Sequence, residues 1–505
     1  MEIRDRYAPS PTGPQHIGGV RTALFNYLFA CSTGGKFILR LEDTDQSRSE
    51  ERYVQNLYDT FEWLGFRWDE GPDKGGSFGS YIQSERTEIY QKYAGELLEK
   101  DCAYRCFCTS ERLDNVRKER EKAGLSGYDR FCRSISKEES QNRSEKKEAF
   151  TIRLKIPLAE MGEESQSTSF YDHIIGQVEW KNEDINPDPV LLKSDGFPTY
   201  HLANVVDDHL MEITHILRAQ EWLPSVPLHV IMYRAFGWEH PKFCHLPMVM
   251  GLDGKKLSKR HGSTSIDEFR KQGILPDALI NYVAMVGASY EEGKDIYTLD
   301  ELAAHFSIDK LNKAPGIFDY KKLEWFNGQY IRMKTNEELA NLSLSFAMEA
   351  GLFGRSGIAP GQEPDSEQKE IYIKAMSLIK ERLIYLTEIP DKLSYIFRRP
   401  PLPPKEEYIN PKSDPSKDGY ISPSGVLERA KSLMEDMANS PSDEEAENIL
   451  KSYLEKEGIK LGDFMMPLRI AITGSRVSPH LFGSIRLLGK EESMVRLEEA
   501  IALLG

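Results

Sequence analysis

The chain has 505 residues, of which 40% are hydrophobic and 29% are charged, as is typical of a soluble globular protein. At roughly 150 residues per domain, this length predicts three or four domains. The first residues lack the apolar stretch of a secretory signal, and no apolar run approaches the roughly 18 residues of a membrane span, so we expect a cytoplasmic protein that does not enter a membrane. A net charge of −15 does not exclude a nucleic-acid partner, because phosphates respond to local lysine and arginine patches.

The first organised stretch combines a turn, a helix and a strand. Residues 9–14 hold three prolines and a glycine, residues 20–28 carry apolar side chains at helical spacing, and glycines at 34–35 end the helix before a buried strand at 37–41. A glycine-containing turn before a helix N-terminus favours phosphate binding, and His16 lies at that helix start. The alternative is an ordinary helix start of an α/β protein.

The next segments predict a parallel sheet with an insertion. Helices are expected at 51–64 and 86–100, and together with the opening they make a β-α-β-α pattern. Residues 105–195 interrupt this pattern with short strands, turns and a charged helix near 109–123. We interpret them as a subdomain inserted into the sheet domain.

Four of the six cysteines lie between residues 102 and 132, without the spacing of a disulfide framework. Cys106, Cys108, Tyr128 and Cys132 could place three thiolates and a phenol around one ion. Structural zinc normally has four ligands from cysteine and histidine, and only three sulfurs match here. Two interpretations stay open: a structural Zn²⁺ site, which we expect, and partly buried free thiols beside Cys102.

Between residues 196 and 222 two apolar runs, at 200–209 and 212–221, end in polar clusters, as strands do at the ligand-binding edge of an open α/β sheet. A buried arginine is costly unless it is paired, so Arg218 is expected to face an anion. The alternative is a structural ion pair with Asp207 or Asp208.

A basic loop follows an apolar strand that begins near residue 245. Four lysines and arginines fall within residues 255–260, after an Asp-Gly turn. Such loops are usually only solvated. This one lies between Gly254 and Gly262, which suit a mobile loop that contacts phosphate.

The rest of the chain is predicted to be helical. Helices are expected at 337–350 and 368–392, and residues 398–424, with seven prolines, are interpreted as a linker or a long ordered loop between two helical bundles. Capping boxes are predicted to open helices at three places: Ser265–Glu268, Thr298–Glu301 and Ser442–Glu445.

Two segments carry a family resemblance. Pro-Ser-Pro-Thr-Gly-x-x-His-Ile-Gly-Gly at 9–19, with Leu-Glu-Asp-Thr-Asp at 41–45, resembles the first signature of class I aminoacyl-tRNA synthetases in the form of the bacterial-type glutamyl-tRNA synthetases. Lys-Leu-Ser-Lys-Arg at 256–260 resembles the second signature, Lys-Met-Ser-Lys-Ser. The resemblance covers nearly the whole chain and is strongest before residue 330.

The resemblance implies an α/β fold: a Rossmann-like parallel-sheet catalytic domain with an inserted α+β subdomain, followed by all-α C-terminal domains. It also implies ATP-dependent ligation of L-glutamate to tRNA through a glutamyl-adenylate, with Mg²⁺ accompanying ATP, by a monomer. The expected parts are the catalytic domain at 1–104 and 196–262, the inserted acceptor-stem-binding subdomain at 105–195, a helical stem-contact domain at 263–330 and a helical anticodon-binding region at 331–505.

By the same resemblance, the site residues fall into two sets. The expected ATP-binding residues are His16, Gly18, Gly19, Glu221, Lys256 and Lys259. Three of them, His16, Lys256 and Lys259, are also expected to be catalytic. Those for glutamate are Arg6, Ala8, Ser10, Glu42, Tyr200, Asn204 and Arg218. Glu42 would take the ammonium group, and Arg218 would take the side-chain carboxylate, because a guanidinium distinguishes a carboxylate from an amide.

The chain departs from the family pattern at three positions. Gly19 stands where the general class I motif has a second histidine, as is common in glutamyl enzymes. Ala219 and Gln220 before Glu221 leave the role of Glu221 less defined. Ser134 stands where some zinc-bearing members add a histidine ligand.

Three related readings compete. A glutaminyl-tRNA synthetase would end in β-barrels, and a short paralogue that glutamylates a modified tRNA base would lack the second half of the chain. A catalytically idle tRNA-binding paralogue is disfavoured by the retention of His16, Lys256, Lys259 and Arg218. The sequence leaves open whether tRNA for glutamine is also charged, which would depend on bases read by residues 331–505.

Overall fold

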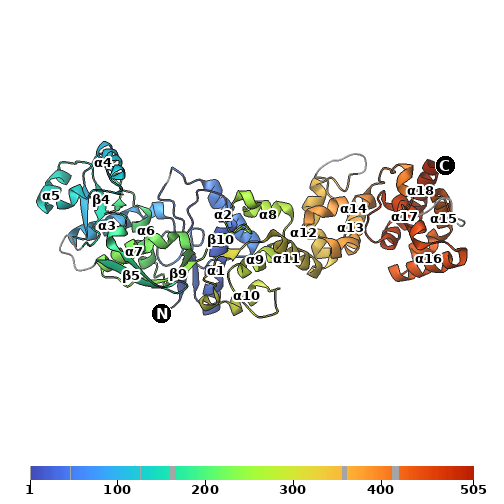
Figure 1. The fold of residues 1–505 in the computed structure, drawn as a ribbon, viewed down its shortest axis with the longest axis horizontal. Coiled ribbons are helices and arrows are strands. Elements are labelled where there is room, and N and C mark those ends of the chain that lie inside the picture. The colour runs from blue at the N-terminus through green and yellow to red at the C-terminus, as the bar shows by residue number, and fades with distance from the viewer. Residues whose placement is uncertain (1, 46, 126, 159–165, 355–360, 412–419) are drawn as a thin grey trace. The chain divides into compact units, whose positions relative to one another are not determined.

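The computed structural model describes residues 2–45, 47–125, 127–158, 166–354, 361–411 and 420–505. They form two compact units: Met1–Phe269 with Leu279–Tyr320, and Arg270–Ala278 with Lys321–Gly505. The labelled strands belong to the blue-to-green part of the chain, whereas the part from yellow to red is labelled with helices (Figure 1). No helix in the described ranges is long and apolar enough to cross a membrane.

Two pairs of parallel strands form the centre of the first unit. β1 (Arg4–Tyr7) pairs with β2 (Lys36–Leu39), and β8 (His215–Ala219) pairs with β9 (Lys242–Leu246). The backbone N–H of Thr214 donates to the carbonyl oxygen of Arg4 at 2.8 Å, which links β8 to β1. After β1 the chain returns as β2 on one side, and after β8 it returns as β9 on the other side. In open α/β sheets ligands bind at such a reversal of strand order.

Helices connect these strands, and the first of them is the helix that the sequence predicts after the turn at 9–14. α1 (Ile17–Thr33) joins β1 to β2 and ends at Gly34, which adopts the left-handed conformation with φ of 65°. α7 (Val226–Phe236) joins β8 to β9. The predicted helices of the first half are confirmed as α2 (Glu51–Leu64), α3 (Thr87–Glu99) and α4 (Ser110–Lys122).

The expectation of a strand ending in polar residues at 200–209 is wrong. This segment is helix α6 (Tyr200–Leu210), which buries Leu202, Val205 and Val206 together with two aspartates. A short apolar run is ambiguous between a buried strand and a buried helix, and packing decides. The second run, at 212–221, contains β8 as expected.

The inserted segment contributes an antiparallel sheet and a hairpin. β3 (Ala103–Cys106), β4 (Thr151–Leu154) and β7 (Val190–Leu192) form an antiparallel sheet. β5 (Ser167–Asp172) and β6 (Gly176–Lys181) form a hairpin, and β5 also pairs in parallel with β9. The hairpin therefore extends the central sheet, and α5 (Lys137–Glu145) lies between β3 and β4 in the sequence.

After β9 the chain forms short elements. β10 (Val249–Met250) pairs in parallel with β11 (Gly316–Ile317). The helices are α8 (Ile266–Gln272), α9 (Pro276–Met285) and α10 (Leu299–His305). The capping box at Thr298 and Glu301 is confirmed at the start of α10.

The described residues of the second unit are helical. Its elements include α11 (Tyr320–Met333), α12 (Asn336–Glu349), α13 (Ser366–Ile379), α14 (Ile389–Phe397), α15 (Pro423–Asn439), α16 (Asp443–Glu457), α17 (Leu461–Thr473) and α18 (Leu481–Leu504). Ser442 caps α16 by accepting from the backbone N–H of Glu445 at 3.1 Å.

The expectation of one helix over 368–392 is wrong, because α13 ends at Ile379 and α14 begins at Ile389. Asn327 Nδ2 donates to the carbonyl oxygen of Ile384 at 2.5 Å, and Pro390 has no N–H to continue a helix from the preceding turn. In the proline-rich stretch, Tyr408 is buried in the core of α15–α18, so its first part is an ordered loop, while residues 412–419 lie outside the described ranges.

Candidate active site

A cavity of about 1530 Å³ lies in the first unit, where residues that follow β1, β2, β8 and β9 meet. Small-ligand pockets usually measure about 300–1,000 Å³, so this cavity has room for a nucleotide and a second small molecule. Every residue predicted for ATP or glutamate lines it except Lys259: Arg6, Ala8, Ser10, His16, Gly18, Gly19, Glu42, Tyr200, Asn204, Arg218, Glu221 and Lys256. The side chain of Lys259 lies outside the described part of the structure.

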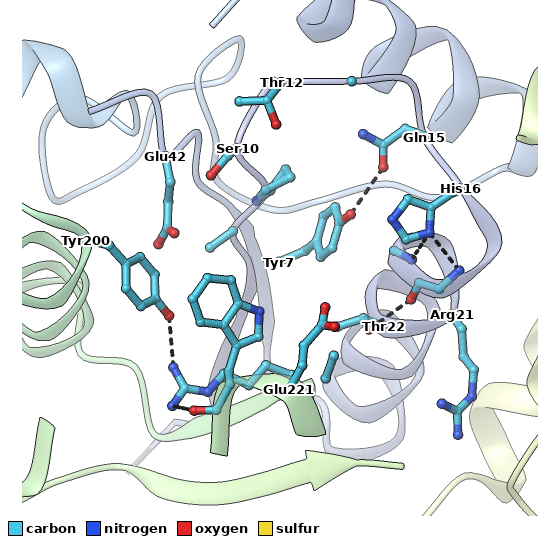
Figure 2. Close-up of a pocket in the computed structure, with 18 of the residues that line it drawn as sticks. Tyr7, Ser10, Thr12, Gln15, His16, Arg21, Thr22, Glu42, Tyr200 and Glu221 are labelled. Atoms are coloured by element: carbon cyan, nitrogen blue, oxygen red, sulfur yellow. Dashed lines mark hydrogen bonds between the residues drawn. The ribbon is translucent and has the colours of Figure 1, made fainter. Parts of the chain in front are cut away.

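The labelled side chains occupy two sides of the cavity. Figure 2 shows Ser10, Glu42 and Tyr200 on one side and His16 with Thr22 on the other, with Glu221 between them. The first group belongs to the predicted glutamate set, and His16 belongs to the predicted ATP set. These members of the two sets thus lie on different sides of one cavity.

His16 caps helix α1. Its Nδ1 accepts from the backbone N–H groups of Gly18 and Gly19 at 3.1 and 3.3 Å. Because Nδ1 accepts, the proton of the neutral ring lies on Nε2, where it can be donated to a ligand oxygen. Desolvation by the cavity walls lowers the pKa of His16, and the Lys256 cation acts in the same direction while Glu221 opposes it. The uncharged ring is therefore favoured at neutral pH.

Gly19 makes room for a buried tyrosine. A Cβ atom at this position would lie 2.8 Å from the hydroxyl oxygen of Tyr7, closer than real Cβ contacts. The same hydroxyl group donates to Gln15 Oε1 at 3.1 Å, which holds the ring against the helix start. A residue with a Cβ atom at position 19 would therefore displace the Tyr7 hydroxyl from its present place.

Backbone hydrogen bonds join the first signature segment to residues that directly follow the basic loop. The N–H of Ile17 donates to Thr264 O at 3.0 Å, and the N–H of Ile266 donates to Gln15 O at 3.1 Å. Lys256 Nζ donates to Glu221 Oε2 at 2.6 Å, and both side chains are exposed. The basic loop therefore stands beside the helix start, with Lys256 directed to the carboxylate of Glu221.

On the side of the cavity where Glu42 lies, buried charged side chains form a connected series of ion pairs. Arg6 donates through Nε and Nη2 to the two oxygens of Asp208 at 3.0 and 3.2 Å. Arg40 bridges Asp208 Oδ1 at 2.8 Å and Glu42 Oε1 at 3.0 Å. Asn204 Nδ2 donates to the same Oε1 at 3.2 Å. Burial raises the pKa of Glu42, although Arg40 and Arg6 oppose that effect. Because these contacts end on Oε1, Oε2 remains for a ligand.

Arg218 lies at the end of β8. Its Nε donates to His245 Nε2 at 3.0 Å, its Nη1 to the Tyr200 hydroxyl at 2.9 Å and its Nη2 to the carbonyl oxygen of Trp222 at 3.3 Å. The Tyr200 and Trp222 rings lie against each other with centroids 4.6 Å apart. Three of the five N–H donors of a guanidinium are thus used, which leaves one on each Nη nitrogen.

The alternative of an ion pair between Arg218 and Asp207 or Asp208 is wrong. Arg86 Nε donates to Asp207 Oδ1 at 2.8 Å, and Asp208 accepts from Arg6 and Arg40. The described partners of Arg218 are a histidine, a phenol and a carbonyl group, all neutral acceptors. Its positive charge therefore remains available to an anion in the cavity.

The comparisons with known proteins agree with this geometry. The family described as tRNA synthetases class I (E and Q), catalytic domain, matches residues 2–325, and an anticodon binding domain matches residues 336–501. A glutamate–tRNA ligase of Treponema denticola is 55% identical over 99% of both chains. The chain belongs to the glutamate–tRNA ligases.

Other relatives span the same length. The glutamate–tRNA ligase of Thermus thermophilus is 42% identical over 98% of this chain and 99% of its own. The crystal structure of a glutamate–tRNA ligase from Elizabethkingia meningosepticum, solved in complex with its amino acid, is 35% identical with a TM-score of 0.86 over all of both chains. The predicted fold class, a Rossmann-like catalytic domain followed by helical domains, is confirmed.

The cysteine cluster of this glutamate–tRNA ligase lies apart from the cavity residues. The sulfur atoms of Cys106, Cys108 and Cys132 lie within 4.8 Å of one another. The Tyr128 hydroxyl is 3.3 Å from the first two sulfurs. A hydrogen bond with Cys132 lowers the pKa of Cys106, whereas burial raises the pKa of Tyr128. Three sulfurs and one oxygen fit a structural zinc ion, with the phenol as the weakest of the four donors.

Sequence reasoning missed several residues that shape the ligase site. Arg40 donates to Asp208, which had been considered only as a partner of Arg218. Trp222 and His245 accept hydrogen bonds from Arg218. The one usable signal was Arg40, a charged residue in a predicted buried strand, which a buried partner must accompany. The partners of His245 come from other strands, and no local pattern indicates them.

Proposed function

We propose that the cavity binds ATP and L-glutamate together and forms a glutamyl-adenylate, from which the glutamyl group passes to tRNA. Glutamate–tRNA ligases carry out this ATP-dependent ligation. The observation that carries the assignment is the arrangement of charge in one cavity. The carboxylate of Glu42 lies on the side opposite to His16 (Figure 2), and the Arg218 cation donates to Tyr200 on the side of Glu42. Among the described residues, no feature favours a catalytically idle paralogue.

Glutamate would be bound by groups of opposite charge. Its ammonium group would bind to Oε2 of Glu42, and the charge of the ammonium would favour the ionised form of this buried carboxyl. Its side-chain carboxylate would accept from the two remaining N–H groups of Arg218. Arg6, Ala8 and Ser10 would line the space between these ends.

ATP would bind on the side of His16. The Nε2–H of His16 and the positive end of the α1 dipole suit phosphate oxygens, and the glycines at 18 and 19 carry no side chain that would block their approach. Lys256 would exchange its carboxylate partner Glu221 for phosphate, and Lys259 would bind the same leaving group. Glu221 would then be free to contact the nucleoside.

The reaction would need stabilised charge and no covalent nucleophile on the protein. A carboxylate oxygen of glutamate attacks the α-phosphorus of ATP, and the bond to the β-phosphate breaks with the release of pyrophosphate. Lys256 and Lys259 would neutralise the charge that gathers on this leaving group. Mg²⁺, which binds mainly to nucleotide phosphates, would add to this neutralisation, and Asp45 is a carboxylate available to it in the cavity.

In the second step, a hydroxyl oxygen of the terminal adenosine of tRNA attacks the acyl carbon, and AMP leaves. We propose that residues 105–195 and 263–330 contact the acceptor end and stem, and that residues 331–505 read the anticodon. The anticodon binding domain matched over 336–501 supports the last of these roles. A monomer in the cytoplasm suffices for this cycle.

The first test concerns Arg218. In ATP–pyrophosphate exchange with tRNA present, Arg218→Gln should raise the KM for glutamate roughly 10- to 150-fold, the equivalent of about 1.5–3 kcal/mol for a hydrogen bond to a charged group. The KM for ATP should change little, because ATP binds at the other side. Arg52→Gln, at an exposed arginine, is the control. Equal changes in both constants would refute the assignment.

We further propose that Cys106, Cys108, Tyr128 and Cys132 hold a structural zinc ion. Zinc would stabilise the inserted subdomain by tying two segments together. Elemental analysis of the purified enzyme should give about one zinc per chain, and Cys108→Ser should reduce both the zinc content and the melting temperature. Cys31→Ser, at an exposed thiol outside the cluster, should change neither. A zinc-free wild-type enzyme of the same stability would contradict the proposal.

A further inference from the structure

A buried hydrogen-bonded chain leads from the central sheet to Arg218. Arg218 Nε donates to His245 Nε2 at 3.0 Å, and His245 Nδ1 lies 2.7 Å from Asp172 Oδ2. The three residues belong to adjacent strands, β8, β9 and β5. Asp172 and His245 have no exposed surface, and Arg218 is only 5% exposed. Since buried polar groups are costly unless they are paired, this chain is a built feature of the sheet.

The hydrogen-bond directions in this chain have one consistent arrangement. Arginine Nε can only donate, so His245 Nε2 must accept. Asp172 Oδ1 accepts from the backbone N–H groups of Ile174 and Ile175, both at 2.9 Å, and Oδ2 accepts from that of His245 at 3.1 Å. A carboxylate surrounded by donors accepts from Nδ1 as well. His245 is therefore the neutral tautomer with its proton on Nδ1.

The charges of the chain agree with this arrangement. Burial lowers the pKa of His245 to about 4, despite the hydrogen bond with Asp172, so the ring is uncharged at neutral pH. Burial acts to raise the pKa of Asp172, but the hydrogen bonds from His245 and from backbone N–H groups lower it below its usual value. An ionised aspartate thus holds a neutral histidine, which in turn presents a lone pair to Arg218.

This lone pair determines how the guanidinium group of Arg218 is oriented. The Nε bond fixes the plane of the group, and the bonds to Tyr200 and to the Trp222 carbonyl fix its rotation. We propose that Asp172 and His245 are positioning residues that lock Arg218 with its two remaining Nη–H groups toward the side chain of the amino acid, and thereby set the preference for glutamate over glutamine. The inference rests on the proposed function, in which Arg218 binds the side-chain carboxylate.

The fixed orientation of Arg218 matters because its guanidinium group has only donors to offer to the side chain of the amino acid. A carboxylate accepts from both Nη groups, whereas an amide places its own NH₂ against one of them. A guanidinium that could turn away would lessen that conflict and would admit the amide. Holding Nε in place removes this freedom, so the histidine acts on specificity without touching the amino acid. A site that leaves polar groups unpaired with the wrong substrate discriminates strongly.

The experiment compares three variants of the full-length enzyme by ATP–pyrophosphate exchange with tRNA. His245→Leu removes the acceptor, and His245→Gln keeps an acceptor oxygen near the position of Nε2. His173→Leu, at an exposed histidine on the neighbouring turn, is the matched control. L-Glutamine is titrated as a competitor of glutamate in each case.

We expect His245→Leu to raise the KM for glutamate at least about tenfold, with the KM for ATP within about twofold of the wild type. The ratio of the glutamine inhibition constant to the glutamate KM should fall, because the unlocked arginine rejects the amide less. His245→Gln should restore most of both values. Similar defects in the Leu and Gln variants, or parallel changes for glutamate and ATP, would show a merely structural histidine and overturn the inference.

A second measurement observes the ring of His245 in the wild-type enzyme itself. Nitrogen NMR of the wild-type enzyme, assigned by comparison with His245→Gln, should show the Nδ1–H tautomer for this ring. An Nε2–H tautomer or a charged ring would overturn the inference. The Arg218→Gln variant separates the two proposals: if it leaves the glutamate KM unchanged, the proposed role of Arg218 fails. If it raises that KM and His245→Leu does not, only the positioning role fails.

Discussion

Glu42→Gln offers a sharp test of how the enzyme would recognise the ammonium group of glutamate. Oε1 of Glu42 accepts from Arg40 at 3.0 Å and from Asn204 at 3.2 Å, so a glutamine would keep its oxygen there and turn its NH₂ toward the ligand. That group would meet the ammonium donor with a donor. The substitution also removes one of the two negative charges that balance Arg6 and Arg40 in the buried chain with Asp208.

The magnitude follows from the lost charged hydrogen bond. A hydrogen bond to a charged group contributes about 1.5–3 kcal/mol, which corresponds to a roughly 10- to 150-fold loss in kcat/KM for glutamate. ATP–pyrophosphate exchange with tRNA, measured over a range of glutamate and of ATP, gives both constants. Thermal unfolding checks that the variant is folded. Glu50→Gln, at an exposed residue paired with Arg52, is the control.

An analogue adds a readout that loss of stability does not affect. 2-Hydroxyglutarate has a hydroxyl group in place of the ammonium group, so the wild-type enzyme should bind it far more weakly than glutamate. In the Glu42→Gln variant this difference should shrink, because the carboxylate that distinguishes the two is gone. An unchanged ratio, or equal losses for glutamate and ATP, would refute the role of Glu42.

Two further predictions concern the start of the chain. Gly19→Ala would place a methyl group 2.8 Å from the Tyr7 hydroxyl and should raise the KM for ATP, whereas Gly95→Ala, with open space around it, should leave kinetics unchanged. Asp5, whose carboxylate oxygens have no hydrogen-bond partner among the described residues, has a pKa raised well above its usual value by burial. The unfolded chain releases this proton near pH 3.9. The contribution of Asp5 to wild-type stability should therefore fall by about 1.4 kcal/mol per pH unit above that pH, until the pKa of folded Asp5 is reached. Asp5→Asn should therefore raise the melting temperature more at pH 8 than at pH 5, and the reverse order would contradict the assignment.

Local patterns were sufficient for the elements that begin and end on strong signals. Helix α1 ends at Gly34 because a left-handed residue there costs glycine little, and α10 opens with the expected Thr298–Glu301 capping box. Local patterns failed where a short apolar segment is equally compatible with a strand and with a helix. Residues 200–209 were expected as a strand and lie in a helix, because burial against neighbouring elements selected among conformations that the apolar run allows.

The sequence by itself determined the family and the two sets of candidate residues, because phosphate-binding turns, helix starts and basic loops depend on residues adjacent in the chain. Only the tertiary structure decided which charges neutralise one another. Asp208 holds Arg6 across 202 positions, and Asp172 reaches His245 across 73. A buried charge must find a partner wherever the fold places one, and the sequence carries no local trace of that choice. The candidate site residues are therefore readable from motifs, whereas their orientation and ionisation are properties of the folded sheet.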